Sequence, residues 1–232
     1  MPVESHSAPR AAKSSVFIVD DHAIVREGLA LLIDREPDLS VCGDADEACS
    51  ALRRIEEMKP DLIIVDISLN GPDGLDLLKT IRTRNASLPV LILSMLDESF
   101  YAERALRAGA NGYIMKQEAT EQVLTAIRRI LGGEIYVSEA IANRMLHRFI
   151  GGGQAGSRSV MAGLSDRELE VFRLIGQGHG TRQIAEELHI SVKTVESYQG
   201  HIKEKLLLKN ARELVQLAIQ WSVPREPEFR SK

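Results

Sequence analysis

The sequence predicts an α/β fold, a doubly wound five-stranded parallel sheet, followed by a second, all-α domain of four helices. Short apolar runs alternate with helical patterns between residues 14 and 135, which is typical of such a sheet. A glycine-rich run at 151–157 follows, with the composition of a flexible linker. Beyond it, every patterned segment has a helical period.

The predicted strands are short apolar segments that end in polar residues or glycine. They are 15–19, 39–43, 61–68, 89–94 and 112–116. The segments between them repeat their apolar residues with a helical period. The first has Ile24, Val25, Leu29, Leu32 and Ile33 on one face, and the others are 45–58, 75–82, 99–108 and 120–131. Further helices are expected at 138–149, 165–176, 181–189, 192–206 and 211–221.

The stretch Asp61–Ser68 is the centre of this pattern. Its apolar residues 62–65 indicate a strand buried on both faces, and the run then delivers Asp66. In open α/β sheets, reactive groups collect at the carboxyl ends of strands. On its own, Asp66 is either a turn or N-cap residue or a reactive acid, and its strand does not decide between the two.

Four predicted strands end in groups suited to phosphoryl chemistry. Asp20 and Asp21 close the first strand, Asp66 the third, Ser94 the fourth and Lys116 the fifth. Carboxylates that meet at one edge repel one another unless a cation joins them, and oxygen ligands favour Mg²⁺. Lysine and serine could hold phosphoryl oxygens while Asp66 acts as nucleophile and forms an acyl phosphate.

This pattern resembles the receiver domain of two-component response regulators over residues 14–135. The matching pieces are Val19–His22, Asp66 with Asp73–Leu75 after it, Ser94, Gly109–Tyr113 and Lys116. The resemblance implies a flavodoxin-like fold in which Asp66 accepts phosphate from a histidine kinase. It implies a Mg²⁺ ion held by Asp20, Asp21, Asp66 and the backbone carbonyl of Ser68. Ser94 and Tyr113 would form the switch pair, the aromatic ring swinging inward once the hydroxyl turns to the phosphoryl group.

The chain departs from the family pattern in two places. Leu69 and Asn70 stand where many members carry Met-Pro. Gln117 follows Lys116 where proline or aspartate is common, which leaves open whether that peptide bond is cis.

The second domain contains two short helices joined by a tight turn. Ile184, Ala185 and Leu188 form the core face of the first helix, and the turn at 190–194 contains Ser191, a good N-cap. The second helix is polar outward, which suits a helix that lies in the DNA major groove. Thr181, Ser191 and Thr194 could offer hydroxyls and amides to phosphates. Periodicity alone equally allows a small protein-interaction domain.

The second domain resembles the LuxR-type DNA-binding domain over residues 163–222, and the linked pair resembles the NarL/FixJ family. The motifs are 164–171, 184–188, 190–195 and 202–206. The resemblance implies that Glu196, Ser197 and Gly200 face the bases. It implies that Lys193, Thr194, Lys203 and Lys209 bind phosphates. Gly178–Gly180 departs from the family pattern, so the cap of the first helix would rest on Thr181 alone.

The last helix, with Leu214, Leu217 and Trp221, is expected either to complete the core or to pair two DNA-bound copies. Both roles are possible on different faces, and the second would make the phosphorylated protein a homodimer.

The remaining segments are predicted as connections and tails. Residues 1–13 form a disordered tail, 136–162 a linker helix with a glycine-rich linker, and 223–232 a second tail. The N-terminus has no apolar signal region and no run is long enough to span a bilayer, which predicts a cytoplasmic bacterial protein without a membrane partner. Cys42 and Cys49 match no metal-ligand spacing and are interpreted as ordinary buried or semi-buried thiols of a reducing cytosol.

The leading hypothesis is a phosphorylation-dependent transcriptional regulator that binds promoter DNA. The main alternative is a constitutive DNA-binding regulator with a weakly used receiver. A Mg²⁺-dependent aspartyl-phosphate phosphatase would need a second aspartate two residues after Asp66, where the chain has Ser68. We therefore expect no catalysis beyond the receiver's own phosphoryl transfer and slow dephosphorylation. A ligand-sensing LuxR regulator is disfavoured by the strand–helix alternation.

Overall fold

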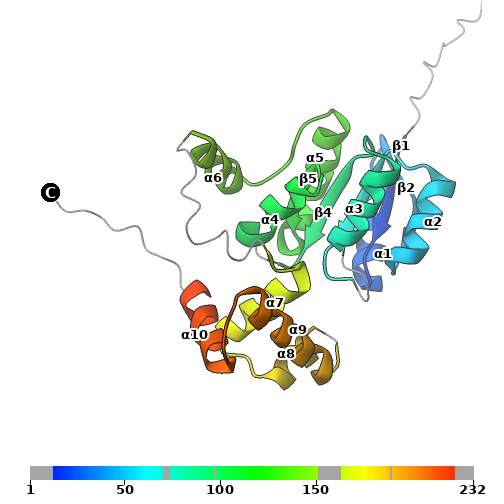
Figure 1. Ribbon diagram of the computed structural model, residues 1–232. Coiled ribbons are helices and arrows are strands. Elements are labelled where there is room, and N and C mark those ends of the chain that lie inside the picture. The colour runs from blue at the N-terminus through cyan, green and yellow to red at the C-terminus, as the bar shows by residue number, and fades with distance from the viewer. Residues whose placement is uncertain (1–12, 70–73, 97, 151–162, 189, 223–232) are drawn as a thin grey trace, which may run out of the picture. The chain divides into compact units, whose positions relative to one another are not determined.

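A computed structural model describes residues 13–69, 74–96, 98–150, 163–188 and 190–222 (Figure 1). The chain divides into two compact units, Met1–Gly152 and Gly153–Lys232, and each is described by itself. Both predicted tails, apart from Lys13, lie outside the described residues, as do Asn70, Asp73 and the glycine-rich run at 151–157.

The first unit alternates strands with helices, as the sequence predicts. The strands are β1 (Ser14–Val19), β2 (Leu39–Ala45), β3 (Leu62–Asp66), β4 (Val90–Ser94) and β5 (Gly112–Met115). The helices are α1 (Ala23–Asp34), α2 (Ala48–Met58), α3 (Gly74–Arg84), α4 (Glu98–Arg107), α5 (Ala119–Leu131) and α6 (Glu139–Ile150), with the short 3₁₀ turn η1 (Lys116–Glu118) before α5.

The five strands form one parallel sheet in the order β2-β1-β3-β4-β5, so the predicted fold class is confirmed. Every residue of the central strand β3 is buried, because helices cover both faces of the sheet. The register runs from Val19 through Val65 and Ile92 to Tyr113. The carboxyl ends of β1, β3, β4 and β5 therefore lie along one edge.

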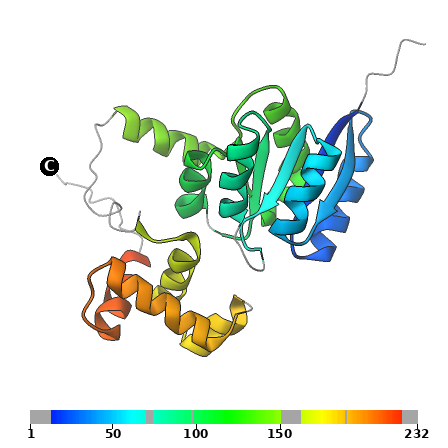
Figure 2. The same ribbon diagram turned by 45° about the vertical axis from the view of Figure 1, so that its right-hand side comes forward.

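Alternate residues of each strand point to opposite faces of the sheet, and each face has its own hydrophobic core. Val16, Ile18, Ile64 and their equivalents pack with α1 and α5, and the other face is covered by α2, α3 and α4 (Figures 1 and 2). The prediction that Ile24 shares the buried face of α1 is wrong, since its exposed fraction is 85%. Ile24 lies about 100° around the helix from Val25, and so falls outside the stripe centred on Leu29 and Ile33.

The second unit is all-α, as predicted. Its helices are α7 (Asp166–Gly176), α8 (Thr181–Glu187), α9 (Val192–Lys205) and α10 (Ala211–Ser222). Their core is aliphatic around Phe172, whose ring meets Trp221 edge-on with ring centroids 5.7 Å apart. Among the described residues, no helix has the length and apolarity needed to cross a membrane.

Candidate functional site

The polar residues predicted at the strand ends meet in one buried pocket. Asp20 follows β1 directly, Asp66 and Ser94 are the last residues of β3 and β4, and Lys116 follows β5. Asp20 and Asp66 are each 1% exposed, and Ser94 is fully buried. Parallel pairing brings these residues together, because the carboxyl ends of neighbouring parallel strands lie at the same edge of the sheet.

Lys116 is the cation of this pocket. Its Nζ lies 2.6 Å from Asp20 Oδ2 and 2.8 Å from Asp66 Oδ2. Burial raises the pKa of Asp66, with Lys116 opposing that rise and the Asp20 carboxylate adding to it. Burial alone would lower the pKa of Lys116, but Asp66 and Asp20 outweigh burial and raise it. Lys116 is therefore charged and pairs with both carboxylates. Removing these charged groups from water costs desolvation free energy, which the ion pairs offset.

The donor atoms of the pocket fit a hard cation. One ligand atom from each of Asp20, Asp21, His22 and Asp66 lies within 4.8 Å of the others. Asp20 Oδ2 and Asp21 Oδ1 are buried, and each has one close cationic or imidazole neighbour, Lys116 Nζ at 2.6 Å and His22 Nδ1 at 2.7 Å. A carboxylate oxygen has more than one lone pair, so these buried oxygens can also bind Mg²⁺. The Ser68 amide donates to Asp66 Oδ1 at 3.1 Å, which holds the turn after β3 against the acid.

Two residues near the acids are absent from the predicted set. His22 Nδ1 lies 2.7 Å from Asp21 Oδ1, and only its place after the two aspartates could have indicated this contact. Gly74, at the start of α3, packs so closely that a Cβ atom there would lie 1.9 Å from the Asp66 carbonyl oxygen. Its amide donates to the Ile67 carbonyl at 2.9 Å. Glycine is required here because the helix starts directly against the backbone of Asp66.

The predicted switch residues share one partner, Leu96, in the loop between β4 and α4. Ser94 Oγ accepts a hydrogen bond from the Leu96 amide at 3.1 Å. The Tyr113 hydroxyl donates to the Leu96 carbonyl at 2.7 Å. Tyr113 is only 1% exposed, so its ring already lies inward in this structure. No described peptide bond is cis, which answers the question raised by Gln117.

The helix-turn-helix is formed by α8 and α9. Ser191 caps α9 as predicted, its Oγ accepting from the Thr194 amide at 3.0 Å. The prediction that the cap of α8 rests on Thr181 is wrong, because the N-cap is Gly180. Glycine has no capping side chain, so Gln183 of the first turn compensates by accepting from the Gly180 amide at 2.8 Å.

The residues predicted to contact DNA lie at exposed or partly exposed positions of α8, of α9 and its N-cap, and of the turn after α9. Ser191, Lys193, Glu196, Ser197 and Lys209 are exposed, and Thr181, Thr194, Gly200 and Lys203 are partly exposed. Ser197 Oγ donates to the Lys193 carbonyl at 3.0 Å. A Cβ atom on Gly200 would meet nothing within 4 Å, so the missing side chain leaves open space on this face.

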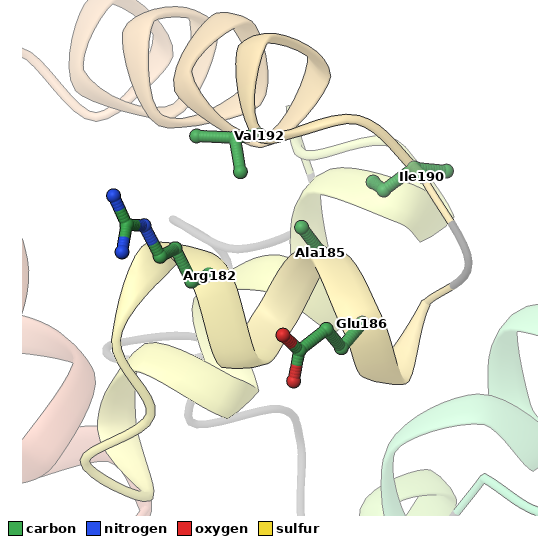
Figure 3. A pocket seen from close by; sticks show the side chains of 5 residues that line it. All are labelled: Arg182, Ala185, Glu186, Ile190 and Val192. Atoms are coloured by element: carbon green, nitrogen blue, oxygen red, sulfur yellow. The ribbon is translucent and has the colours of Figure 1, made fainter.

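A surface hollow with a volume of about 490 Å³ lies between α8 and the start of α9. Figure 3 shows Arg182, Ala185 and Glu186 projecting from α8, with Ile190 in the turn and Val192 at the start of α9. Val192 is 40% exposed. Arg182 and Glu186 have opposite charges, so the lining favours neither anions nor cations.

Glu168 joins the first turn of α7 to the end of α9, a link that the sequence analysis missed. Its carboxylate lies 2.7 Å from Lys205 Nζ and accepts from the Ser165 amide at 2.6 Å. Burial would raise the pKa of Glu168, but the hydrogen bonds from Lys205 and Ser165 lower it. Glu168 therefore fixes the orientation of α9 within its domain.

The last helix, α10, divides between core and surface. Leu214 is 2% exposed and packs in the core, which leaves it unavailable to a second copy. Leu217 and Trp221 are partly exposed. Val215 and Ile219, one turn apart, are 43% and 46% exposed and were not among the predicted pairing residues.

Comparisons with known proteins agree with both units. Residues 16–128 match the response regulator receiver domain family, and residues 162–218 match the luxR family of bacterial regulatory proteins. The chain is 37% identical over 209 residues to the oxygen regulatory protein NreC of Staphylococcus aureus, with 88% of this chain and 96% of that protein covered.

Solved structures give the same result. One match is a LuxR-family two-component response regulator from Aurantimonas sp., with 34% identity, a TM-score of 0.56, and coverage of 60% of this chain and 99% of that one. Another is RcsB from Salmonella enterica serovar Typhimurium bound to the promoter rprA with the phosphomimetic BeF₃⁻, with 26% identity, a TM-score of 0.57, and coverage of 90% and 99%. With its receiver followed by a LuxR-type DNA-binding domain, the chain belongs to the NarL/FixJ family of two-component response regulators.

Proposed function

We propose that Asp66 is the phosphoacceptor and that its phosphorylation by a histidine kinase raises the affinity of residues 163–222 for promoter DNA. The observation that carries the proposal is the buried pocket itself. Asp66 lies at the end of the central strand with Lys116 Nζ 2.8 Å away, beside the buried carboxylate oxygens Asp20 Oδ2 and Asp21 Oδ1, which are close enough to share a cation with it. A nucleophile, a place for a cation and a fixed positive charge are the parts that phosphoryl transfer requires.

In this proposal, Asp20, Asp21, Asp66 and the Ser68 backbone carbonyl hold Mg²⁺. Bound there, the ion supplies positive charge that offsets the incoming phosphoryl group. An Asp66 carboxylate oxygen attacks phosphorus, the bond from phosphorus to the kinase histidine nitrogen breaks, and the electron pair stays on that nitrogen. Lys116 pairs with one phosphoryl oxygen and the Ser94 hydroxyl donates to another.

The acyl phosphate then acts as a signal through the switch residues. Ser94 turns toward the phosphoryl group, and the inward position of Tyr113 is favoured by its bond to Leu96. The change shifts the population toward a form that dimerises and binds DNA. Only an element that differs between the two states can carry this shift. Because Tyr113 is already inward in this structure, the parts that change are Ser94 and the loop before α4, which both switch side chains contact.

We assign DNA contacts by the placement of side chains on α9 and the ends of its neighbours. Glu196, Ser197 and Gly200 face bases, while Lys193, Thr194, Lys203 and Lys209, together with Thr181 and Ser191, hold phosphates. The exposed side of α10, with Leu217 and Trp221, pairs two copies. The domain bounds are 14–135 for the receiver, 136–162 for the linker and 163–222 for the DNA-binding domain, in a cytoplasmic bacterial protein.

The test treats the full chain with acetyl phosphate and Mg²⁺. Intact mass should show one added phosphoryl group, and affinity for duplexes selected by the protein from a random-sequence pool should rise. Asp66→Asn should abolish both responses. Asp76→Asn, which changes an exposed aspartate of α3, should keep both. Unchanged phosphorylation in Asp66→Asn would exclude Asp66 as acceptor.

The same measurements decide the alternative, a constitutive DNA-binding regulator with a weakly used receiver. In that case Asp66 would still be phosphorylated, but DNA affinity and oligomeric state would be equal with and without phosphate. Steady release of phosphate from generic phosphate esters would instead indicate an enzyme.

A further inference from the structure

The helix predicted as a linker, α6, is bound to the receiver at the first turn of α4. The Ser138 Oγ donates to Glu98 Oε1 at 2.7 Å. From the next turn of α6, Arg144 Nη1 donates to the Ser99 carbonyl at 2.8 Å. Between these two bonds Ile141 is 2% exposed, so an apolar contact completes the attachment. The chain from residue 138 to 144 is therefore part of the receiver's packing.

The segment that leads into α6 is attached at a second place, strand β5. Tyr136 forms a parallel bridge beside Gly112. The Tyr113 amide donates to the Tyr136 carbonyl, and the Tyr136 amide donates to the Asn111 carbonyl, each at 2.9 Å. Gly112 allows this approach, because a Cβ atom there would lie 2.9 Å from the Tyr136 carbonyl oxygen.

Both attachments start at the switch. Tyr113 holds Tyr136 through its amide and Leu96 through its hydroxyl. Leu96 also donates to Ser94 Oγ, and Glu98, the anchor of Ser138, follows two residues later in the chain. The contacts thus form a closed ring through Tyr113, Leu96, the first turn of α4, the start of α6 and Tyr136. Leu96 is thus linked to α6 by two routes, one through Tyr113 and Tyr136 and the other through the first turn of α4.

We infer that Tyr136, Ser138, Ile141 and Arg144 form a latch, the α6 latch, which is closed in this structure and released from α4 when Asp66 is phosphorylated. The inference rests on the proposed function of Asp66. In the proposed function the Ser94 side chain turns toward the phosphoryl group to donate its proton, and this turn carries Oγ away from the Leu96 amide that it now accepts from. The Leu96 amide then loses its acceptor, and the loop before α4 shifts. Glu98 and Ser99 move with the loop, and both hydrogen bonds to α6 lose their geometry.

The latch has a direct consequence for regulation. The 151–162 segment and the DNA-binding domain follow α6 in the chain, so a docked α6 limits the positions open to that domain. The latch contacts exist only in the unphosphorylated form and stabilise it. Their loss on phosphorylation therefore shifts the population toward the DNA-binding form.

The first test measures hydrogen exchange of the α6 amides in the full chain, with and without beryllofluoride and Mg²⁺. The latch predicts faster exchange across 139–150 in the beryllofluoride form, because the helix loses its tertiary contacts. Equal exchange in both forms overturns the latch. This readout does not depend on DNA, so it decides the inference even if phosphorylation leaves DNA affinity unchanged and the proposed function fails.

The second test weakens the latch from each side. Arg144→Met keeps the aliphatic stem and removes the bond to Ser99, and Glu98→Ala removes the partner of Ser138 while leaving α6 intact. Each should raise the DNA affinity of the unphosphorylated protein about tenfold toward the phosphorylated value. Asn143→Ala, at an exposed position of the same helix, is the control and should change nothing. If both variants keep the parent's ratio of phosphorylated to unphosphorylated affinity, the latch is excluded.

Discussion

The acidic pocket of the receiver and the proposed DNA-facing side of the second unit are built in opposite ways. The pocket gathers buried groups from positions as far apart as Asp20 and Lys116, and it exists only when the whole sheet has formed. The DNA-facing side comes almost entirely from one continuous segment, Thr181 to Lys209, and its side chains are exposed or partly exposed. Changes in the pocket should therefore alter stability and chemistry together, whereas changes on the DNA-facing side should alter binding with little effect on stability.

The largest expected effect is at the shared cation of the pocket. Lys116→Met leaves Asp20 and Asp66 buried without their counter-charge and should lower the free energy of unfolding by about 4 kcal/mol at neutral pH. Without the lysine the pKa of Asp66 rises further, because Lys116 opposes the effect of burial, so mild acidification should restore part of the loss. Urea unfolding at two pH values measures both effects.

The matched control is Lys79→Met, which removes a lysine that is 57% exposed and paired with Asp76 on the surface of α3. Its cost should stay within about 0.5 kcal/mol at either pH. Equal losses in the two variants would mean that the pocket has no special electrostatic cost.

A pair of glycines tests the close packing behind the acid. Gly74→Ala places a Cβ atom 1.9 Å from the Asp66 carbonyl oxygen and should cost about 3 kcal/mol through displacement of backbone. Gly28→Ala, in α1, meets nothing within 4 Å and should stabilise the receiver by about 0.5–1 kcal/mol. Thermal unfolding gives both values, and a neutral Gly74→Ala would show that α3 can shift away from β3 without loss.

Two serines compare structure with recognition on the DNA-binding side. Ser191→Ala removes the N-cap of α9 and should cost about 1 kcal/mol. Ser197→Ala changes an exposed mid-helix hydroxyl and should leave stability within about 0.5 kcal/mol while it lowers DNA affinity. The comparison requires urea unfolding and DNA titration of the same samples. An unchanged affinity in Ser197→Ala would remove this residue from the proposed base-facing set.

The smallest effect is expected at the surface ion pairs of Arg128. The hydrogen bond from Arg128 holds the pKa of Asp38 near 2, against an ordinary value of 3.8. Because the folded pKa is depressed, this contribution to stability is present above about pH 4 and is lost as the pH falls through about 2. Asp38→Asn should be slightly less stable than the parent near neutral pH and equal to it below pH 2. A difference that persists in acid would point to a cause other than this carboxylate.

Most of the receiver fold could be predicted because the alternation of apolar strands with amphipathic helices repeats along the chain. Apolar strands that end in Asp66, Ser94 and Lys116 indicate both the sheet and the edge where the site forms. The exposure of Ile24 could not be read from the same pattern, since it depends on how α1 rotates against the sheet. Pairwise contacts such as His22 with Asp21 depend on side-chain directions, which a sequence pattern does not specify.

The α4–α6 contacts had no signal in the sequence. Residues 138–149 were recognisable as a helix, but a helical period does not tell which surface the helix will cover. The hydrogen bonds from Ser138 and Arg144 join residues that are about 40 positions apart in the chain. Arg144 bonds to the backbone carbonyl of Ser99, a group that every residue has, so no residue type in the sequence marks this contact. In the second unit, Glu168 was recognised only as part of a motif, and its role as a bridge to Lys205 needed the packing of α7 on α9.

The bridge between Tyr136 and β5 also affects whether the isolated receiver aggregates. β5 is an edge strand, and its unpaired backbone groups would be open to strands of other molecules. Tyr136 pairs with the backbone of Asn111 and Tyr113 and so covers part of that edge. A receiver shortened to end before Tyr136 should therefore aggregate more readily than one that extends through α6. The segment that joins the two units also protects the first from self-association.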